Sequence, residues 1–226
     1  EYGLFKQKIV DGWQTEMPDV WLPGGEVWLT PRSDRVLKVR FGGWISQREE
    51  NGHLVTDYHD DTVIEAMPYD LLISGGGSNI VSTLRLWKAR SVNTFDMKSF
   101  SQGDYTKAME KNNNAEVITK VLYPSDDHTQ GKTLRLKQQY FLVSASIQNI
   151  INDHLKRFKD IRTLPEKAAI HINDTHPALC IPELMRILMD DYDYAWDKAW
   201  DITTKTLAYT NHTVMSEALE VWSIDL

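Results

Sequence analysis

The first part of the chain places hydrophobic and polar residues in short alternating runs, which is the pattern of β-strands. The polar stretch 49–52, which follows one of these runs, is typical of a hairpin turn. Three consecutive glycines at 75–77 separate two longer runs of the same kind. We therefore predict that roughly the first 90 residues are mainly β-structure, with strands at 36–41, 44–46, 62–69 and 79–88.

The hydrophobic spacing changes to a helical one near Phe95. Residues 101–120 are polar helix formers interrupted by three asparagines at 112–114, which predicts two helices or one broken helix. A polar loop at 123–127 then ends the helical region. The clearest helix is predicted over 133–158, because its apolar residues recur with a period of about 3.6 positions: Leu136, Tyr140, Val143, Ile147, Ile150 and Leu155.

Two short apolar runs near the end of the chain each finish in polar residues. The run 168–172 is followed by Asn173 and Asp174, and a second predicted strand covers 208–213. Between them we predict a helix at about 181–190, with Pro182 in its first turn, and another at 195–208. This strand–helix–helix–strand order predicts an α/β layer.

Composition and charge narrow the classes of protein. The chain has 226 residues, 42% of them hydrophobic, with eight Trp, so it can bury a substantial core. Its net charge of −7 argues against nucleic acid as a partner. Cys180 is the one cysteine, which excludes an internal disulfide and suits a reducing compartment. No apolar stretch is long enough to span a bilayer, and no signal-peptide pattern is present.

Three polar clusters follow predicted secondary structure and are candidates for ligand binding. They cover 125–128, 173–176 and 211–213, the last followed by Glu217 and Glu220. In open α/β sheets, ligands bind outside the carboxyl ends of the strands. Asn, Asp, His and Glu together supply the donors and acceptors that sugar hydroxyls require.

Each cluster also has a purely structural interpretation. Asp126 and Asp127 could be turn residues or a helix cap, and the 173–174 pair could cap the helix near Pro182. A histidine at the end of an apolar strand, such as His212, is often a structural residue. Glu217 and Glu220 are spaced as on a solvated helix face. The spacing alone leaves these alternatives open.

A metal site is a further alternative. His171, Asp174 and His176 are spaced somewhat like metallohydrolase ligands. On a strand, however, His171 and Asp174 would point to opposite faces. We therefore expect no metal site here.

Eight segments resemble the α-glucan phosphorylase family, in the family's order and across nearly all of the chain. They are EYGLFKQKI at 1–9, DGWQ at 11–14, TLRLWKAR at 83–90, VLYP at 121–124, LRLKQQYF at 134–141, NDTHPAL at 173–179, IPELMR at 181–186 and YTNHTV at 209–214. The chain begins at Glu1 without Met and stops just after an apolar stretch. We therefore expect it to be an internal piece of such an enzyme.

The resemblance implies a GT-B-type fold, in which two Rossmann-like domains face each other across a cleft. The chain would be part of the N-terminal domain, with residues 1–226 as a single partial domain: a β-rich portion at 1–94 and an α/β portion with active-site loops at 95–226. The implied enzyme is a glycosyltransferase that uses phosphate to release glucose 1-phosphate from glycogen, starch or maltodextrin. It carries pyridoxal phosphate on a lysine whose motif this chain lacks, so the chain alone should be inactive.

The resemblance also implies roles for individual residues. His212 matches the histidine of the glucosyl site, with its side chain near the sugar's 6-hydroxyl and its carbonyl facing positive charge that develops on the ring. Asp126 and Asp127 fall on a gate loop, which reads Asn-Asp-Asn in the family and Ser125-Asp126-Asp127 here. The remaining implied substrate-binding residues are Asn173, Asp174, His176, Glu220 and Arg135.

Other functions remain to be distinguished. A catalytically inert carbohydrate-binding or interaction module could keep the same fold, and a glycoside hydrolase could use Asp174 and Glu220 as its two carboxyl groups. The helix around 104–120 matches a region at the family's dimer interface, so we expect a homodimeric parent. We also expect a cytoplasmic protein without nucleic-acid or membrane partners.

Overall fold

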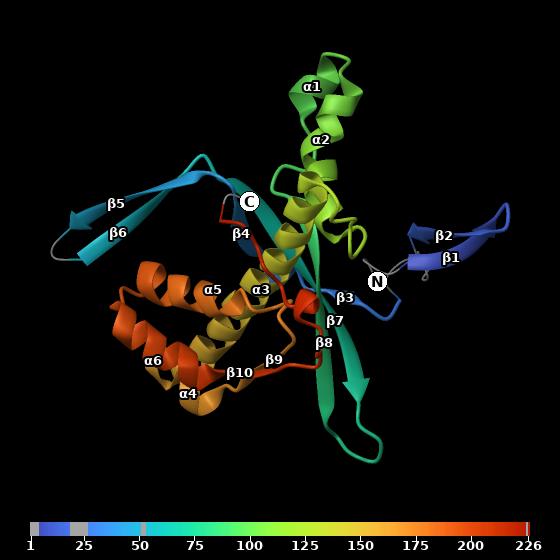
Figure 1. The fold of residues 1–226 in the computed structure, drawn as a ribbon. Coiled ribbons are helices and arrows are strands. Elements are labelled where there is room, and N and C mark those ends of the chain that lie inside the picture. Colours follow the sequence, from blue (N-terminus) through green and yellow to red (C-terminus); the bar gives the residue numbers. More distant parts are fainter. Residues whose placement is uncertain (1–4, 19–26, 51–52, 225) are drawn as a thin grey trace. The chain divides into compact units, whose positions relative to one another are not determined.

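The computed structural model describes residues 5–18, 27–50, 53–224 and 226 (Figure 1). They form two compact units, each described here by itself. The first comprises Glu1–Arg40 and Val63–Gln138, and the second comprises Phe41–Thr62 and Gln139–Leu226. Strands dominate the order of elements as far as Ser91 and helices dominate from Met97, as the hydrophobic pattern predicts.

The first unit contains an antiparallel hairpin and a four-stranded sheet. β1 (Phe5–Val10) pairs with β2 (Trp13–Pro18). Their turn, Asp11–Gly12, has positive φ at both residues, the geometry that suits the twist of a two-residue hairpin. In the sheet, β7 pairs with every other strand. The sheet consists of β3 (Thr30–Pro31), β4 (Leu37–Phe41), β7 (Thr62–Ser74) and β8 (Val81–Ser91).

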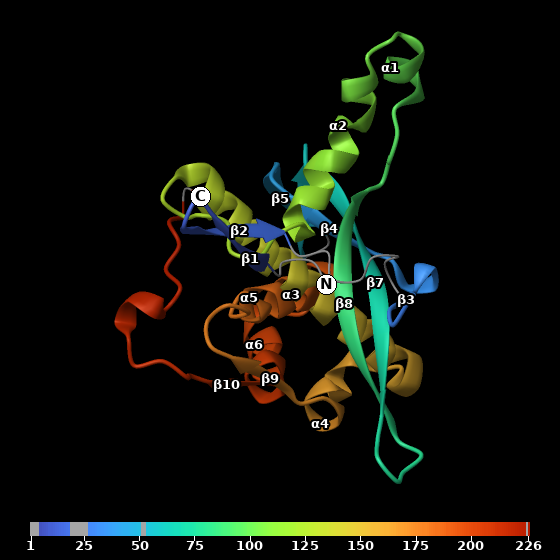
Figure 2. The same cartoon turned by 90° about the vertical axis from the view of Figure 1, so that its right-hand side faces the viewer.

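β7 and β8 form a long antiparallel hairpin (Figure 2). A buried ion pair joins its two strands. Asp70 lies directly opposite Arg85, and both Asp70 oxygens accept hydrogen bonds of 2.7 Å from that guanidinium. Arg32 adds a third contact of 3.2 Å. Although Asp70 is only 4% exposed, these bonds, chiefly those from Arg85, lower the pKa of its carboxyl. The pair therefore satisfies a charge that would be costly to bury alone.

The helices of the first unit correct one prediction. α1 (Met97–Ser101) is followed by α2 (Tyr105–Glu116), which runs unbroken through the three asparagines and into a 3-10 turn, Val117–Thr119. The predicted interruption at 112–114 was therefore wrong. Ala108 and Ala115 are buried on α2, which packs against β8, and Asn112 donates to Glu116 at 3.0 Å. Tertiary packing thus outweighs the weak helix propensity of asparagine.

The second unit combines helices with a small parallel sheet. β9 (Ile170–Asn173) pairs in parallel with β10 (Leu207–Thr210), which confirms the predicted α/β arrangement. Both predicted helices between these strands form, and the first continues into a π-helical turn, Ile187–Asp191. The predicted long helix also forms and begins four residues earlier than expected, in the first unit. The helices are α3 (Thr129–Phe158), α4 (Leu164–Lys167), α5 (Cys180–Arg186) and α6 (Trp196–Thr206).

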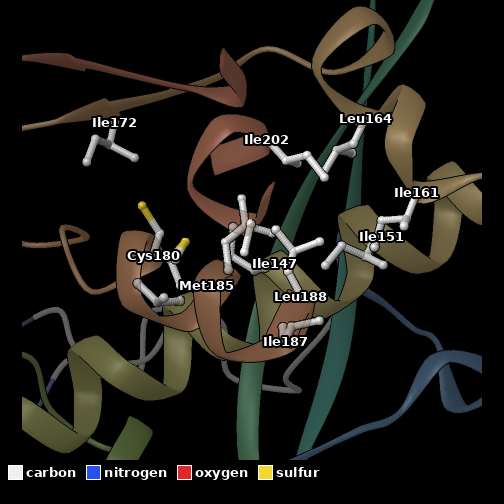
Figure 3. Close-up of a cluster of buried hydrophobic side chains, with 13 residues drawn as sticks. Ile147, Ile151, Ile161, Leu164, Ile172, Cys180, Met185, Ile187, Leu188 and Ile202 are labelled. Atoms are coloured by element: carbon white, nitrogen blue, oxygen red, sulfur yellow. The ribbon is translucent and has the colours of Figure 1, made fainter. Parts of the chain in front are cut away.

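The core of the second unit is a cluster of apolar side chains from these helices and from β9 (Figure 3). Leu164, Leu184 and Leu188 are fully buried in it, and Ile202 is 2% exposed. At roughly 1.5–3 kcal/mol for each fully buried large apolar side chain, this cluster is the main favourable term for the unit. It holds the helices against the strands that carry the polar clusters.

A buried carboxylate ties α3 to α5. Glu183 is 2% exposed and accepts hydrogen bonds from Tyr140 at 3.1 Å, Ser144 at 2.7 Å and Arg186 at 2.8 Å. Burial, followed by the nearby charge of Glu183, raises the pKa of Tyr140 to about 12. Because both carboxylate oxygens are satisfied, the charge is tolerated inside the unit.

The second unit also includes the hairpin of β5 (Trp44–Glu50) and β6 (His53–His59), which confirms the predicted hairpin. The two turn residues at 51–52 lie outside the described residues. An isolated two-stranded hairpin is marginally stable in water. Here Thr56 donates to Asp190 at 3.3 Å, and the Tyr58 hydroxyl donates to the same carboxylate. These bonds fix the hairpin to the helical part of its unit.

The described part of the chain contains no helix with the length and hydropathy needed to cross a membrane.

We predict that Leu188→Ala destabilises the protein by about 2–5 kcal/mol, because it leaves a cavity in the fully buried core. The matched control is Leu142→Ala on α3, where the side chain is 51% exposed and the loss should stay below about 1 kcal/mol. Urea unfolding measures both. Equal losses would contradict the assignment of Leu188 to the core.

We further predict that the Cys180 thiol reacts slowly in the native state. It is 3% exposed, and burial raises its pKa to about 11, so its thiolate fraction at pH 8 is about a hundredfold lower than for a thiol at its ordinary pKa of 9.0. Labelling with a disulfide reagent, followed by mass spectrometry of the Cys180 peptide, should show slow modification that becomes fast in urea. Rapid labelling of the native protein would contradict the burial.

Candidate functional site

The parallel register of β9 and β10 brings two of the predicted polar clusters together. Thr210, the last residue of β10, lies opposite Asn173, the last residue of β9. The backbone N–H of Asp174 then donates to the Thr210 carbonyl at 2.8 Å, just past the end of the ladder. Asp174 adopts a positive φ of 59°, which turns the chain sharply at this point. Residues 173–176 and 211–213 therefore leave the sheet at the same edge.

Asp174 and Asn173 hold His212 at two places. Asp174 Oδ1 accepts the backbone N–H of His212 at 2.9 Å, and His212 Nε2 lies 3.2 Å from Asn173 Oδ1. An amide oxygen only accepts, so His212 donates from Nε2 in this contact. In the neutral ring this leaves Nδ1 as the acceptor nitrogen. His212 is solvent-exposed, so its ring is accessible to a ligand.

His176 and Glu220 form the second pair of the cluster. Their Nδ1 and Oε1 atoms are 3.0 Å apart, and the Glu220 side chain is only 11% exposed, against 45% for His176. The interpretation of Glu217 and Glu220 as a solvated helix face does not hold for Glu220. The segment forms only a short 3-10 turn, Ser216–Ala218, and Glu220 lies beyond it.

The structure thus assembles five of the predicted site residues within the second unit: Asn173, Asp174, His176, His212 and Glu220. It also adds Thr175, whose Oγ1 accepts the backbone N–H of Glu220 at 3.0 Å. The sequence contained one weak indication of Thr175, its position between Asp174 and His176. A hydroxyl's partner cannot be deduced from that position.

The remaining predicted residues, Asp126, Asp127 and Arg135, belong to the first unit. The loop that carries both aspartates packs closely on the start of α3. A Cβ at Gly131 would lie 1.6 Å from the Ser125 carbonyl oxygen, so this close approach requires glycine. His128 Nδ1 accepts the Gly131 N–H at 3.0 Å and so caps the helix, whereas Asp126 and Asp127 were the predicted cap candidates.

Arg135 projects from the first turns of α3 toward this loop. Its guanidinium is 3.7 Å from the Asp126 carboxylate and 5.4 Å from the centre of the Tyr123 ring. Tyr123 has a positive φ of 56°, an uncommon backbone conformation for an aromatic residue. Asp126 and Asp127 are both exposed, so their carboxylates remain accessible to solvent. Arg135 therefore anchors one carboxylate of the loop through an ion pair.

His171, Asp174 and His176, the residues considered as metal ligands, do not form a metal-binding group in the described part of the structure. Within the described residues, no group of three His, Cys, Asp or Glu side chains could hold a metal ion. The three residues weighed as metal ligands have other partners: His171 contacts Thr210 at 2.6 Å, Asp174 binds the His212 backbone, and His176 pairs with Glu220.

The cluster also does not fit covalent attachment of pyridoxal phosphate. Attachment as a Schiff base needs a lysine, and neither 170–186 nor 207–224 contains one. The cluster instead contains carboxylate, amide, imidazole and hydroxyl groups, which are hydrogen-bond donors and acceptors, at one end of the β9–β10 sheet. Such a set can bind several hydroxyls of a sugar with fixed orientation.

Comparison with known proteins agrees with this chemistry. The model of the carbohydrate phosphorylase family matches residues 1–226. The chain is 48% identical over 238 aligned positions to the brain form of glycogen phosphorylase from Rattus norvegicus, and 47% identical to the brain and liver forms from Homo sapiens. Each alignment covers 100% of this chain and 27% of the relative. The chain therefore belongs to the carbohydrate phosphorylase family.

Proposed function

We propose that this chain forms the glucosyl-binding part of an α-1,4-glucan phosphorylase, a glycosyltransferase that releases glucose 1-phosphate from glycogen, starch or maltodextrin. The observation that carries the proposal is the pairing of His212 with Asp174 and Asn173 at the end of two parallel strands. The relatives named glycogen phosphorylase, of which the chain spans 27% of the length, support it. In the proposed parent, the chain is a single partial domain of a GT-B-type fold.

In this proposal His212 acts through both its ring and its backbone. The imidazole hydrogen-bonds the 6-hydroxyl of the bound glucosyl group. The backbone carbonyl faces the ring, where positive charge develops as the glycosidic bond breaks. The bond from the His212 N–H to Asp174 supports this role, because it holds the peptide that precedes the carbonyl in one orientation. A dipole fixed in advance needs no reorganisation during the reaction.

The other cluster residues orient the substrate. Asp174, His176 and Glu220 lie in the pocket beside the anomeric carbon of the sugar. Their carboxylates and imidazole contact the sugar hydroxyls there. Asp126 and Asp127 form a gate loop that opens and closes over the site, and the Arg135–Asp126 ion pair biases it toward one position. The resemblance to the α-glucan phosphorylase family supports these assignments.

The proposed parent is a cytoplasmic homodimer that carries pyridoxal phosphate outside this chain. The cofactor supplies an acid–base phosphate group next to the substrate phosphate. Residues of this chain bind and orient the sugar.

We predict that the parent protein, loaded with pyridoxal phosphate, releases glucose 1-phosphate from maltodextrin only when inorganic phosphate is present. An enzymatic assay for glucose 1-phosphate, run beside one for free glucose and maltose, measures this. Sugar release by water without phosphate would favour a hydrolase that uses Asp174 and Glu220. Maltodextrin binding without either product would favour an inert binding module.

We predict that His212→Ala lowers kcat/KM of the parent by about fivefold to a hundredfold, which corresponds to about 1–3 kcal/mol for a lost hydrogen bond in the site. The control is His171→Ala, which removes a neighbouring imidazole on β9 that the proposal does not use. With 6-deoxyglucose 1-phosphate as the donor, the wild type and His212→Ala should differ by less than about threefold. An equal loss with both donors would contradict the contact to the 6-hydroxyl.

A further inference from the structure

The segment after β10 carries two of the proposed site residues but contains little regular structure. From Asn211 to Glu220 it forms one 3-10 turn, Ser216–Ala218. Its internal hydrogen bonds are short-range: Asn211 bonds Thr213, and Thr213 Oγ1 accepts the N–H of Met215. Such bonds shape the segment locally but do not fix its position relative to β9. Figure 2 shows this segment as the irregular stretch that follows β10, and its position relative to β9 depends on contacts outside the segment.

Two consecutive residues of that loop make such contacts. Asp174 accepts the backbone N–H of His212 at 2.9 Å, near the start of the segment. Thr175 Oγ1 accepts the backbone N–H of Glu220 at 3.0 Å, at its end. One loop thus holds the segment at two points, the backbone N–H groups of the proposed site residues His212 and Glu220. Asp174, which makes the first contact, already has a proposed role in binding the substrate. Thr175, which makes the second contact, has no role in the proposed function.

We propose that Thr175 is a positioning residue for Glu220, and this inference rests on the proposed function. Its hydroxyl fixes the backbone of Glu220, and the carboxylate then reaches His176 Nδ1 at 3.0 Å. His176 is the next residue after Thr175, so one loop sets both partners of the pair. A hydrogen bond weakens steeply with distance and angle, so a shift of about 1 Å at the Glu220 backbone would break the contact.

A threonine suits this task for two physical reasons. Its hydroxyl provides the acceptor that a half-buried backbone N–H needs, and its branched Cβ restricts rotation about χ1. Valine has nearly the same shape but no acceptor, whereas serine keeps the acceptor and loses the methyl group. Thr175→Val and Thr175→Ser therefore separate the hydrogen bond from the packing of this side chain.

The test is a double-mutant cycle in the parent enzyme, built from Thr175→Val, Glu220→Ala and the double variant. We expect Thr175→Val to lower kcat/KM for glucose 1-phosphate by about twofold to tenfold, the size of one net hydrogen bond, and Thr175→Ser to lose less than about twofold. In the Glu220→Ala background, Thr175→Val should change kcat/KM by less than about twofold, because its effect passes through Glu220. Full additivity of the two losses would overturn the proposal.

The crystal structure of the Thr175→Val parent gives a readout that does not depend on activity. We expect the Glu220 carboxylate to leave His176 Nδ1 by more than about 1 Å, with the pair intact in Thr175→Ser. An unmoved pair in Thr175→Val would overturn the positioning role. A displaced pair in a parent that lacks phosphorolysis would instead uphold the positioning role while contradicting the proposed function.

Discussion

The parallel pairing of β9 with β10 is the constraint on which the candidate site depends. Its register places Asn173 opposite Thr210, so that the residues following each strand leave the sheet side by side. The His212 backbone can then reach a carboxylate 38 residues earlier in the chain. A slip by one residue would exchange the two faces of the strand and remove every one of these contacts. The chemistry of the site is thus a consequence of strand register.

Two strands of four residues cannot hold this register by themselves. The apolar cluster does so, because Ile172 of β9 packs with side chains of α3, α5 and α6. The buried Glu183 adds specificity: it accepts bonds from α3 and from Arg186 on its own helix, and so restricts how α5 packs on α3. Polar anchors of this kind contribute little net stability but favour a single arrangement. A rigid base of helices thereby supports an irregular segment that carries functional groups.

The two acidic residues of the cluster at the ends of β9 and β10 have different surroundings. Asp174 is engaged through one oxygen with the protein backbone, whereas Glu220 is nearly buried and paired with His176. Their division of work resembles that of many active sites, in which some polar groups contact the ligand and others hold those groups in place. Thr175 belongs to this second class, because its hydroxyl accepts the backbone N–H of Glu220.

The sequence by itself determined the long helix, four strands of the first ninety or so residues (β4, β5, β7 and β8) and the polar strand ends, because periodicity and turn residues are local properties. The family resemblance also indicated five residues that the second unit brings together. Tertiary structure alone decided three further points. α2 continues through its asparagines because Ala108 and Ala115 are buried on it. Glu220 is paired with His176 instead of solvated on a helix. Thr175 has its role because the Glu220 N–H arrives from 45 residues away, and no local pattern encodes a partner at that distance.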